Sequence, residues 1–252
     1  MSDNNLNDIQ SEEVVREEIM AEEEKKEAKL SLFQRILNVF IDPVKAMEDI
    51  SLKPRVLVPM LIITIIFVLL NLARFDLLKE SIIKQLEIAM AQNPNIKMDE
   101  LPENILMIQV YTAFIIASIA PLLMILFKGL LSHGISQIFD GKGKFKASMS
   151  VITFSYFIIL FGEAIRTIVG LLVGNYMVTM SLAAVVPNLE INTPLYILLA
   201  SFDVFTIWYL MVSVVGISVV HKISKGKATV VAVSPWAIFI AFNVIMAMVK
   251  AS

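Results

Sequence analysis

Five long apolar stretches occupy most of the chain after residue 55, and they identify lipid as its solvent. They run over residues 56–73, 108–127, 151–173, 195–220 and 228–249. At a rise of about 1.5 Å per residue, roughly twenty apolar residues match the ~30 Å hydrocarbon core of a bilayer. Backbone groups find no water partner there, so a span must be a helix or part of a closed barrel, and unbroken apolar runs favour helices. The sequence therefore predicts an all-α, polytopic membrane helical bundle with five transmembrane helices.

The segment before the first stretch, residues 30–50, has a different periodicity. Its apolar side chains recur every three or four positions, namely Phe33, Ile36, Leu37, Phe40, Val44 and Met47. This stripe is too interrupted to span a bilayer, and it directly precedes a membrane helix. We therefore predict an N-terminal amphipathic helix that lies in the membrane interface. Asp42-Pro43 is expected to bend or restart it, because proline is tolerated only in a helix's first turn.

The first 29 residues contain ten acidic and four basic side chains. Such a composition cannot bury a core, so residues 1–29 are predicted to be an acidic cytoplasmic tail, disordered or partly helical. We do not expect a signal peptide, because acidic residues stand where it would have a basic start and an apolar stretch. The functional alternative is a docking tail for a cytoplasmic protein partner. Residues 30–252 then form the membrane domain.

The distribution of Lys and Arg predicts the orientation of the bundle. With the N-terminus cytoplasmic, ten basic residues fall in inside segments, Lys128 among them, and five fall in outside segments, with Arg74 at the start of the long first outer loop. This bias favours a cytoplasmic N-terminus and an extracytoplasmic C-terminus. One inside segment carries Lys142, Lys144 and Lys146, a candidate basic cluster for the anionic lipid surface. Ordinary positive-inside charge is the alternative explanation.

The residue inventory excludes several kinds of chemistry. The chain has no cysteine and only two histidines, His133 and His221, each near a predicted membrane boundary. We interpret both as interfacial side chains rather than metal ligands, because further donors at suitable spacing are missing. There is no phosphate-binding glycine loop and no nucleophile elbow. We predict no catalytic residue, cofactor, metal or nucleic-acid partner.

Three ionisable residues inside the predicted spans carry the sharpest chemical signal. Glu163 and Arg166 lie in the third span and Asp203 lies in the fourth. With the predicted topology all three sit at similar depth in the outer half. A bare charge at mid-membrane costs at least ~2.5–3.5 kcal/mol, so mutual pairing is expected. Two readings stay open: a bridge that locks two helices, or a proton, ion or headgroup path in which the surplus acid titrates.

Three glycines in the third span give a weaker signal. Gly170 and Gly174 are four residues apart, and Gly162 lies eight residues before Gly170. Small residues at this spacing permit close contact between membrane helices. Packing within the bundle and association into a homo-oligomer are equally compatible with the pattern.

Several runs of this sequence resemble the Yip-domain family of membrane proteins. The order of five helices agrees, and the similarity covers about residues 31–250. The runs that carry it are FIDPVKAMEDI at 40–50, KPR at 53–55, FDGKGKFK at 139–146, WYL at 208–210 and SKGKA at 224–228.

The resemblance implies a five-span fold and no catalytic signature. Eukaryotic members are Golgi and endoplasmic-reticulum proteins that bind Ypt/Rab GTPases and influence vesicle traffic. Their characteristic cytosolic Asp-Leu-Tyr-Gly-Pro stretch is absent here, which points to the prokaryotic branch and a plasma membrane. We predict a non-enzymatic membrane organiser or adaptor whose partners are membrane lipids. The alternative is a transporter, channel or lipid-translocating protein that uses Glu163, Arg166 and Asp203.

Overall fold

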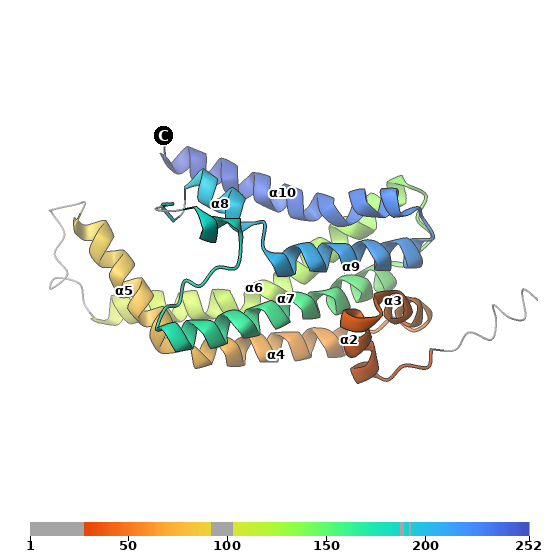
Figure 1. Ribbon diagram of the computed structural model, residues 1–252, viewed down its shortest axis with the longest axis horizontal. Coiled ribbons are helices and arrows are strands. Elements are labelled where there is room, and N and C mark those ends of the chain that lie inside the picture. The colour runs from red at the N-terminus through yellow and green to blue at the C-terminus, as the bar shows by residue number, and fades with distance from the viewer. Residues whose placement is uncertain (1–27, 92–102, 187–188, 192, 252) are drawn as a thin grey trace, which may run out of the picture.

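The computed structural model describes residues 28–91, 103–186, 189–191 and 193–251, and all its regular elements are helices (Figure 1). The described residues contain no strand, only an isolated bridge between Ser181 and Asp203. This confirms the predicted all-α fold class. The helices are α2 (Leu32–Ile41), α3 (Pro43–Leu52), α4 (Leu57–Ala73), α5 (Phe75–Ala91), α6 (Glu103–Ile138), α7 (Phe145–Val173), the 3-10 turn η2 (Leu182–Val185), α8 (Pro194–Ala200), α9 (Val204–His221) and α10 (Lys225–Ala251).

Four of these helices, α6, α7, α9 and α10, are long and apolar enough to cross a membrane. A fifth span results if α4 and α5 are taken as one helix that bends by 64°. The chain is therefore a multi-pass membrane protein, as predicted. The part of the acidic tail up to residue 27 lies outside the described residues, and its conformation stays a prediction.

The predicted fourth span needs correction. Residues 195–220 are not one helix, because the chain breaks at residues 201–203 between α8 and α9. The carboxylate of Asp203 accepts hydrogen bonds from the backbone N–H groups of Phe205 and Thr206, which is how an aspartate caps a helix N-terminus. Mean hydropathy cannot reveal this break, because one cap within an apolar run barely changes the average.

Helix α7 is the centre of the bundle, and it packs against α4, α6 and α9 (Figure 1). Its N-terminal half is buried on every side over residues 147–158. Ala147, Ser148 and Ser150 lie in that half, and such small side chains let neighbouring helices approach closely. Burial from all directions explains why α7 is apolar around its whole circumference.

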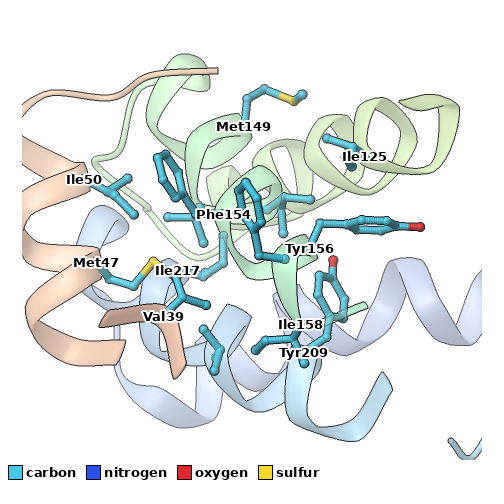
Figure 2. Packing of buried hydrophobic residues seen from close by; sticks show 14 of the residues in the cluster. Val39, Met47, Ile50, Ile125, Met149, Phe154, Tyr156, Ile158, Tyr209 and Ile217 are labelled. Carbon is cyan, nitrogen blue, oxygen red and sulfur yellow. The ribbon is translucent and has the colours of Figure 1, made fainter. Parts of the chain in front are cut away.

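The predicted amphipathic segment folds as a helical hairpin of α2 and α3. As expected, it bends at Asp42-Pro43: Asp42 caps α3, and Pro43 occupies the first position of that helix. The hairpin packs on α7 and α9 at one end of the bundle. Val39, Met47 and Ile50 are fully buried in the apolar core, and they lie beside Phe154 and Ile217 in Figure 2.

Candidate functional site

The structure brings the three predicted intramembrane charges together and adds a fourth. Glu163 accepts a hydrogen bond from Arg166 Nε at 3.0 Å and forms a second ion pair with Arg74. Arg166 Nη1 reaches Asp203 Oδ2 at 2.9 Å. We call Arg74, Glu163, Arg166 and Asp203 the charged cluster.

The charged cluster joins three helices at one end of the bundle. Arg74 stands at the break between α4 and α5, while Glu163 and Arg166 lie one turn apart on α7. Asp203 is the N-cap of α9, so it marks the end of a span rather than a position inside one. The cluster therefore lies where α4 and α9 end, although α7 continues for ten residues beyond Glu163 to Val173.

The fourth member changes the charge balance of the site. The sequence prediction counted two acids and one base and therefore a surplus acid that could titrate. Arg74 supplies the second base, so the formal charge of the cluster is zero. That prediction is wrong for a definite reason. Arg74 follows directly after the first apolar stretch, so the predicted topology places it in the outer loop and not in the cluster.

A cavity of about 360 Å³ opens beside the charged cluster, and the four charged residues line it together with Tyr176 and Tyr196. The Tyr176 ring covers the guanidinium of Arg74, with 4.9 Å from Cζ to the ring centroid. Burial raises the pKa of the Tyr176 hydroxyl, Arg74 opposes this shift, and Glu163 adds to it. This hydroxyl therefore stays protonated at neutral pH and can donate a hydrogen bond.

The three predicted contact glycines have different surroundings. Gly162 packs against the side chain of Phe205 on α9, where an added Cβ would lie 2.5 Å from the ring. Gly174 ends α7 in the left-handed conformation, with φ +65° and no atom near an added Cβ. Gly170 belongs to the same terminus, because its carbonyl accepts the N–H of Asn175. Association into a homo-oligomer through these glycines stays a prediction.

The opposite end of the bundle, which we call the hairpin end, collects the basic inside segments. Lys142 N donates to the carbonyl of His221 at 3.1 Å, and Arg55 N donates to Ser150 Oγ at 3.1 Å. The first bond places residues 139–146 next to residues 221–227, and the second places residues 53–55 next to the N-terminal part of α7. Nine exposed basic side chains lie in α3 and these segments: Lys45, Lys53, Arg55, Lys142, Lys144, Lys146, Lys222, Lys225 and Lys227.

A buried ion pair fixes the geometry of the hairpin. Arg35 Nε lies 2.7 Å from Asp49 Oδ2, and the two side chains are 1% and 9% exposed. Arg35 also donates to the carbonyls of Lys53 and Asp49, while Asp49 Oδ1 accepts the backbone N–H groups of Lys29 and Leu30. A buried pair is maintained when further hydrogen bonds satisfy both partners, as they do here.

The other face of the hairpin is apolar and exposed. Phe33 is 67% exposed and Ile41 is 78% exposed, and neither is among the residues that pack on the core. The remaining members of this face are Leu37, Val44 and Leu52. Exposed apolar patches of this kind occur at sites that bind another protein or a membrane.

The two histidines meet at the hairpin end, although they are 88 positions apart in the sequence. Their ring centroids are 5.8 Å apart. His221 Nε2 lies 2.7 Å from Ser148 Oγ, and Gly143 N–H donates to Nδ1. A neutral ring that accepts at Nδ1 carries its proton on Nε2 and cannot act as a base toward Ser148. Among the described residues, no three His, Cys, Asp or Glu side chains could hold a metal ion.

No local pattern in the sequence indicates that these two histidines lie side by side. Gly141, in the FDGKGKFK run, lies against His221. A Cβ on Gly141 would lie 2.6 Å from His221 Nδ1 and 2.7 Å from the carbonyl oxygen of Ser136. Only glycine permits this close approach.

Lys128 also differs from its predicted setting. The predicted topology places it at the cytoplasmic end of the second span. In the structure α6 continues for ten residues beyond Lys128, and this side chain is only 7% exposed. Its Nζ lies 4.5 Å from the ring centroid of Tyr209 and 5.6 Å from that of Tyr156. Among the described residues, no carboxylate forms an ion pair with Lys128. The number of basic residues in inside segments therefore falls from ten to nine, and it still exceeds the five in outside segments.

The helical bundle and its buried polar sites define a multi-pass α-helical membrane protein. The sequence model described as Yip1 domain matches residues 37–246, which is most of the chain. The protein therefore belongs to the Yip1 domain family, as the resemblance predicted. No curated protein and no solved structure matched the chain.

Proposed function

We propose that this protein is a non-enzymatic membrane organiser that holds an amphipathic hairpin in the cytoplasmic face of the membrane. One observation carries the proposal. The α2–α3 hairpin exposes Phe33, Leu37 and Ile41 at the end of the bundle where nine basic side chains gather. Apolar side chains enter the interface between headgroups and acyl chains, and basic side chains bind anionic headgroups.

The way the hairpin is attached supports an organising role. Its inner face buries Val39, Met47 and Ile50 in the core, and the Arg35–Asp49 pair joins its two helices. A surface held this rigidly inserts at a fixed position relative to the spans. It therefore wedges one leaflet more than the other, and this is how a membrane protein without an enzymatic site can influence membrane shape.

The proposed orientation has the N-terminus in the cytoplasm and the C-terminus outside the cell, in a prokaryotic plasma membrane. The gathering of the basic inside segments at the hairpin end supports it. The chain has no cysteine, so single cysteines can report the topology. A membrane-impermeant maleimide added to intact cells should label a cysteine at Met177 and leave one at Lys144 unlabelled. The reverse result contradicts the orientation.

Insertion of the hairpin can be measured by fluorescence quenching. A polarity-sensitive dye on Ile41→Cys should be quenched by brominated acyl chains in reconstituted vesicles, because that side chain points into lipid. A dye on Glu48→Cys, an exposed position on α3, is the matched control and should stay in water. Equal quenching at the two positions, or none at Ile41→Cys, contradicts the proposed insertion.

The basic side chains give a second measurable property. Each contributes about 1 kcal/mol to attraction toward an anionic leaflet, and salt screens this term. Quenching at Ile41→Cys should therefore increase with the anionic lipid fraction and decrease with salt. The Lys142→Gln, Lys144→Gln, Lys146→Gln triple variant should reduce the dependence on anionic lipid. An unchanged dependence would assign these lysines to ordinary positive-inside charge.

The acidic tail, residues 1–29, is proposed to be the part that meets a cytoplasmic protein. Deletion of residues 2–27 should remove co-purifying proteins and leave the bundle folded, because the described core begins after that point. The thermal unfolding of the deletion variant in detergent checks the second condition. Unchanged co-purifying proteins count against an adaptor role of the tail.

Transport through the charged cluster is the second candidate function, and the cavity beside the cluster favours it. The zero formal charge and the capping role of Asp203 weaken it, because they account for the same residues structurally. Reconstituted vesicles decide this question. A lipid or ion flux that is present in the wild type and lost in Glu163→Gln would support transport. Absence of flux beside a working control protein would dismiss it.

A further inference from the structure

Two cavities at the charged-cluster end share part of their lining. The first, about 360 Å³, contains the charged cluster. The second, about 550 Å³, lies between α5 and the turn after α7, and Tyr176 and Met177 line both. The second cavity has a mixed lining: the apolar side chains are Leu77, Ile88, Val173, Met177 and Ile191, and the charged ones, Glu80 and Lys84, are of opposite sign. One charged compartment thus adjoins one partly apolar compartment, and this arrangement suits an amphiphile.

Within the charged cluster every carboxylate oxygen accepts a hydrogen bond, whereas some of the arginine N–H donors have no partner among the described residues. All four carboxylate oxygens already accept a bond: both of Glu163 from arginines, and those of Asp203 from Arg166 and from backbone N–H groups of α9. The arginines have donors to spare. Arg74 Nε is buried without a partner, and Arg166 bonds described residues only through Nε and Nη1. A guanidinium has five N–H donors and no acceptor.

This imbalance selects the chemistry of a ligand. Spare donors fit anionic oxygen atoms, and guanidinium groups are well matched to phosphate. The protonated hydroxyl of Tyr176 and the hydroxyls of Tyr196, Thr179 and Thr206 line the same cavity and can donate as well. A metal cation would find no free carboxylate oxygen there.

We propose that these two adjoining cavities together bind a zwitterionic phospholipid. Its phosphate would accept hydrogen bonds from Arg74 and Arg166, and an acyl chain would lie along the apolar side of the second cavity. A zwitterionic headgroup fits better than an anionic one, because the four cluster charges already cancel. A phosphate-bearing lipid also fits better than free phosphate, because only the lipid uses the apolar lining. This site lies at the end opposite the hairpin and does not depend on the function proposed for the hairpin.

The test uses the full chain purified in detergent and measures retained lipid by native mass spectrometry. Phosphatidylethanolamine, phosphatidylglycerol and inorganic phosphate are added separately. Ala200→Phe places an aromatic ring in the first cavity and leaves every member of the charged cluster in the sequence. Leu198→Phe, which is 41% exposed on the same helix and does not line the cavity, is the matched control. Phosphatidylethanolamine binding should weaken at least about tenfold in Ala200→Phe and remain unchanged in Leu198→Phe.

A second variant keeps the proposal testable if Ala200→Phe fails to fold. Tyr196→Phe removes one donor with little change in volume, and it should weaken phosphatidylethanolamine binding by about threefold to tenfold. Three results would overturn the proposal: inorganic phosphate retained as tightly as lipid, preference for phosphatidylglycerol, or equal lipid retention in the wild type and both cavity variants. Each of these leaves the quenching measurements on the hairpin unaffected.

Discussion

At the hairpin end of the bundle, nine basic side chains and an apolar helix face are exposed among the described residues. At the charged-cluster end, two arginines and two carboxylates lie within the bundle and bind one another. The two ends therefore use charge for different purposes. Exposed charge of one sign is suited to contact a surface, whereas paired charge of both signs is suited to hold helices together and to orient a small ligand.

Each end also contains an ion pair, which is buried at the hairpin end and partly buried at the charged-cluster end. Arg35 and Asp49 are 14 positions apart and close a local hairpin, while Arg74 and Glu163 are 89 positions apart and join α4 to α7. Removing one partner of a buried pair leaves an uncompensated charge in both cases. The two ends differ in the contact that is then weakened. At the hairpin end it is the docking of α2 and α3 on the bundle, and at the charged-cluster end it is the packing of α4 against α7.

The largest effect is expected from Arg35→Met. The change leaves the carboxylate of Asp49 buried without its cation, at a cost of about 3 kcal/mol or more. Thermal unfolding in detergent and proteolysis of the α2–α3 hairpin measure it. Glu48→Gln, on the exposed side of α3, is the control and should behave like the wild type. Wild-type stability of Arg35→Met would show that packing alone holds the hairpin.

Glu163→Gln is expected to destabilise the bundle by about 2 kcal/mol, because one carboxylate serves both arginines of the cluster. The effect should be smaller than that of Arg35→Met, since Glu163 is 16% exposed and water compensates in part. The midpoint of thermal unfolding is the measurement, with Glu80→Gln on α5 as the control. A larger loss than in Arg35→Met would reverse the ranking of the two ends.

Gly174→Ala tests how the chain leaves α7 at the charged-cluster end. A φ of +65° is strained for alanine, so a loss of about 1 kcal/mol is expected. Gly226→Ala is the control for the effect of an added methyl group, because that glycine lies in the first turn of α10 with no atom near an added Cβ. It should be neutral or stabilising by up to about 1 kcal/mol. Equal melting points for the two variants would contradict the left-handed cap.

Lys128→Met tests the interior between the two ends, and the expected change is the smallest. Lys128 is buried against two tyrosine rings, and within the described part of the chain it has no acidic partner. Methionine removes the cost of burying a charge, while the loss of the cation–π contact offsets part of that gain. A net stabilisation of about 0.5–1 kcal/mol is expected in thermal unfolding. A clear destabilisation would mean that the buried amine is bound to something beyond the two rings.

Much of the fold could be predicted because its determinants are local. Apolar runs predicted the membrane bundle, the three-to-four periodicity predicted the amphipathic segment, and Asp42-Pro43 predicted its bend. The predicted start of the fourth span was wrong, since Asp203 interrupts an apolar run without altering its average hydropathy, and the span begins at Val204. The charged cluster could be predicted only in part. Glu163, Arg166 and Asp203 stand out because charges are rare in apolar runs, while Arg74 lies just past one.

What the sequence determined by itself is the medium and the local conformation of this protein: which segments are apolar enough to enter lipid, which segment is amphipathic, and where the hairpin bends. These follow from interactions between residues a few positions apart and from the transfer of apolar side chains out of water. Only the tertiary structure decided that Arg74 neutralises the cluster, that His221 meets His133, and that Lys128 is buried. These outcomes depend on which helices pack side by side, and distant side chains acquire their charge partners and their solvent only through that packing.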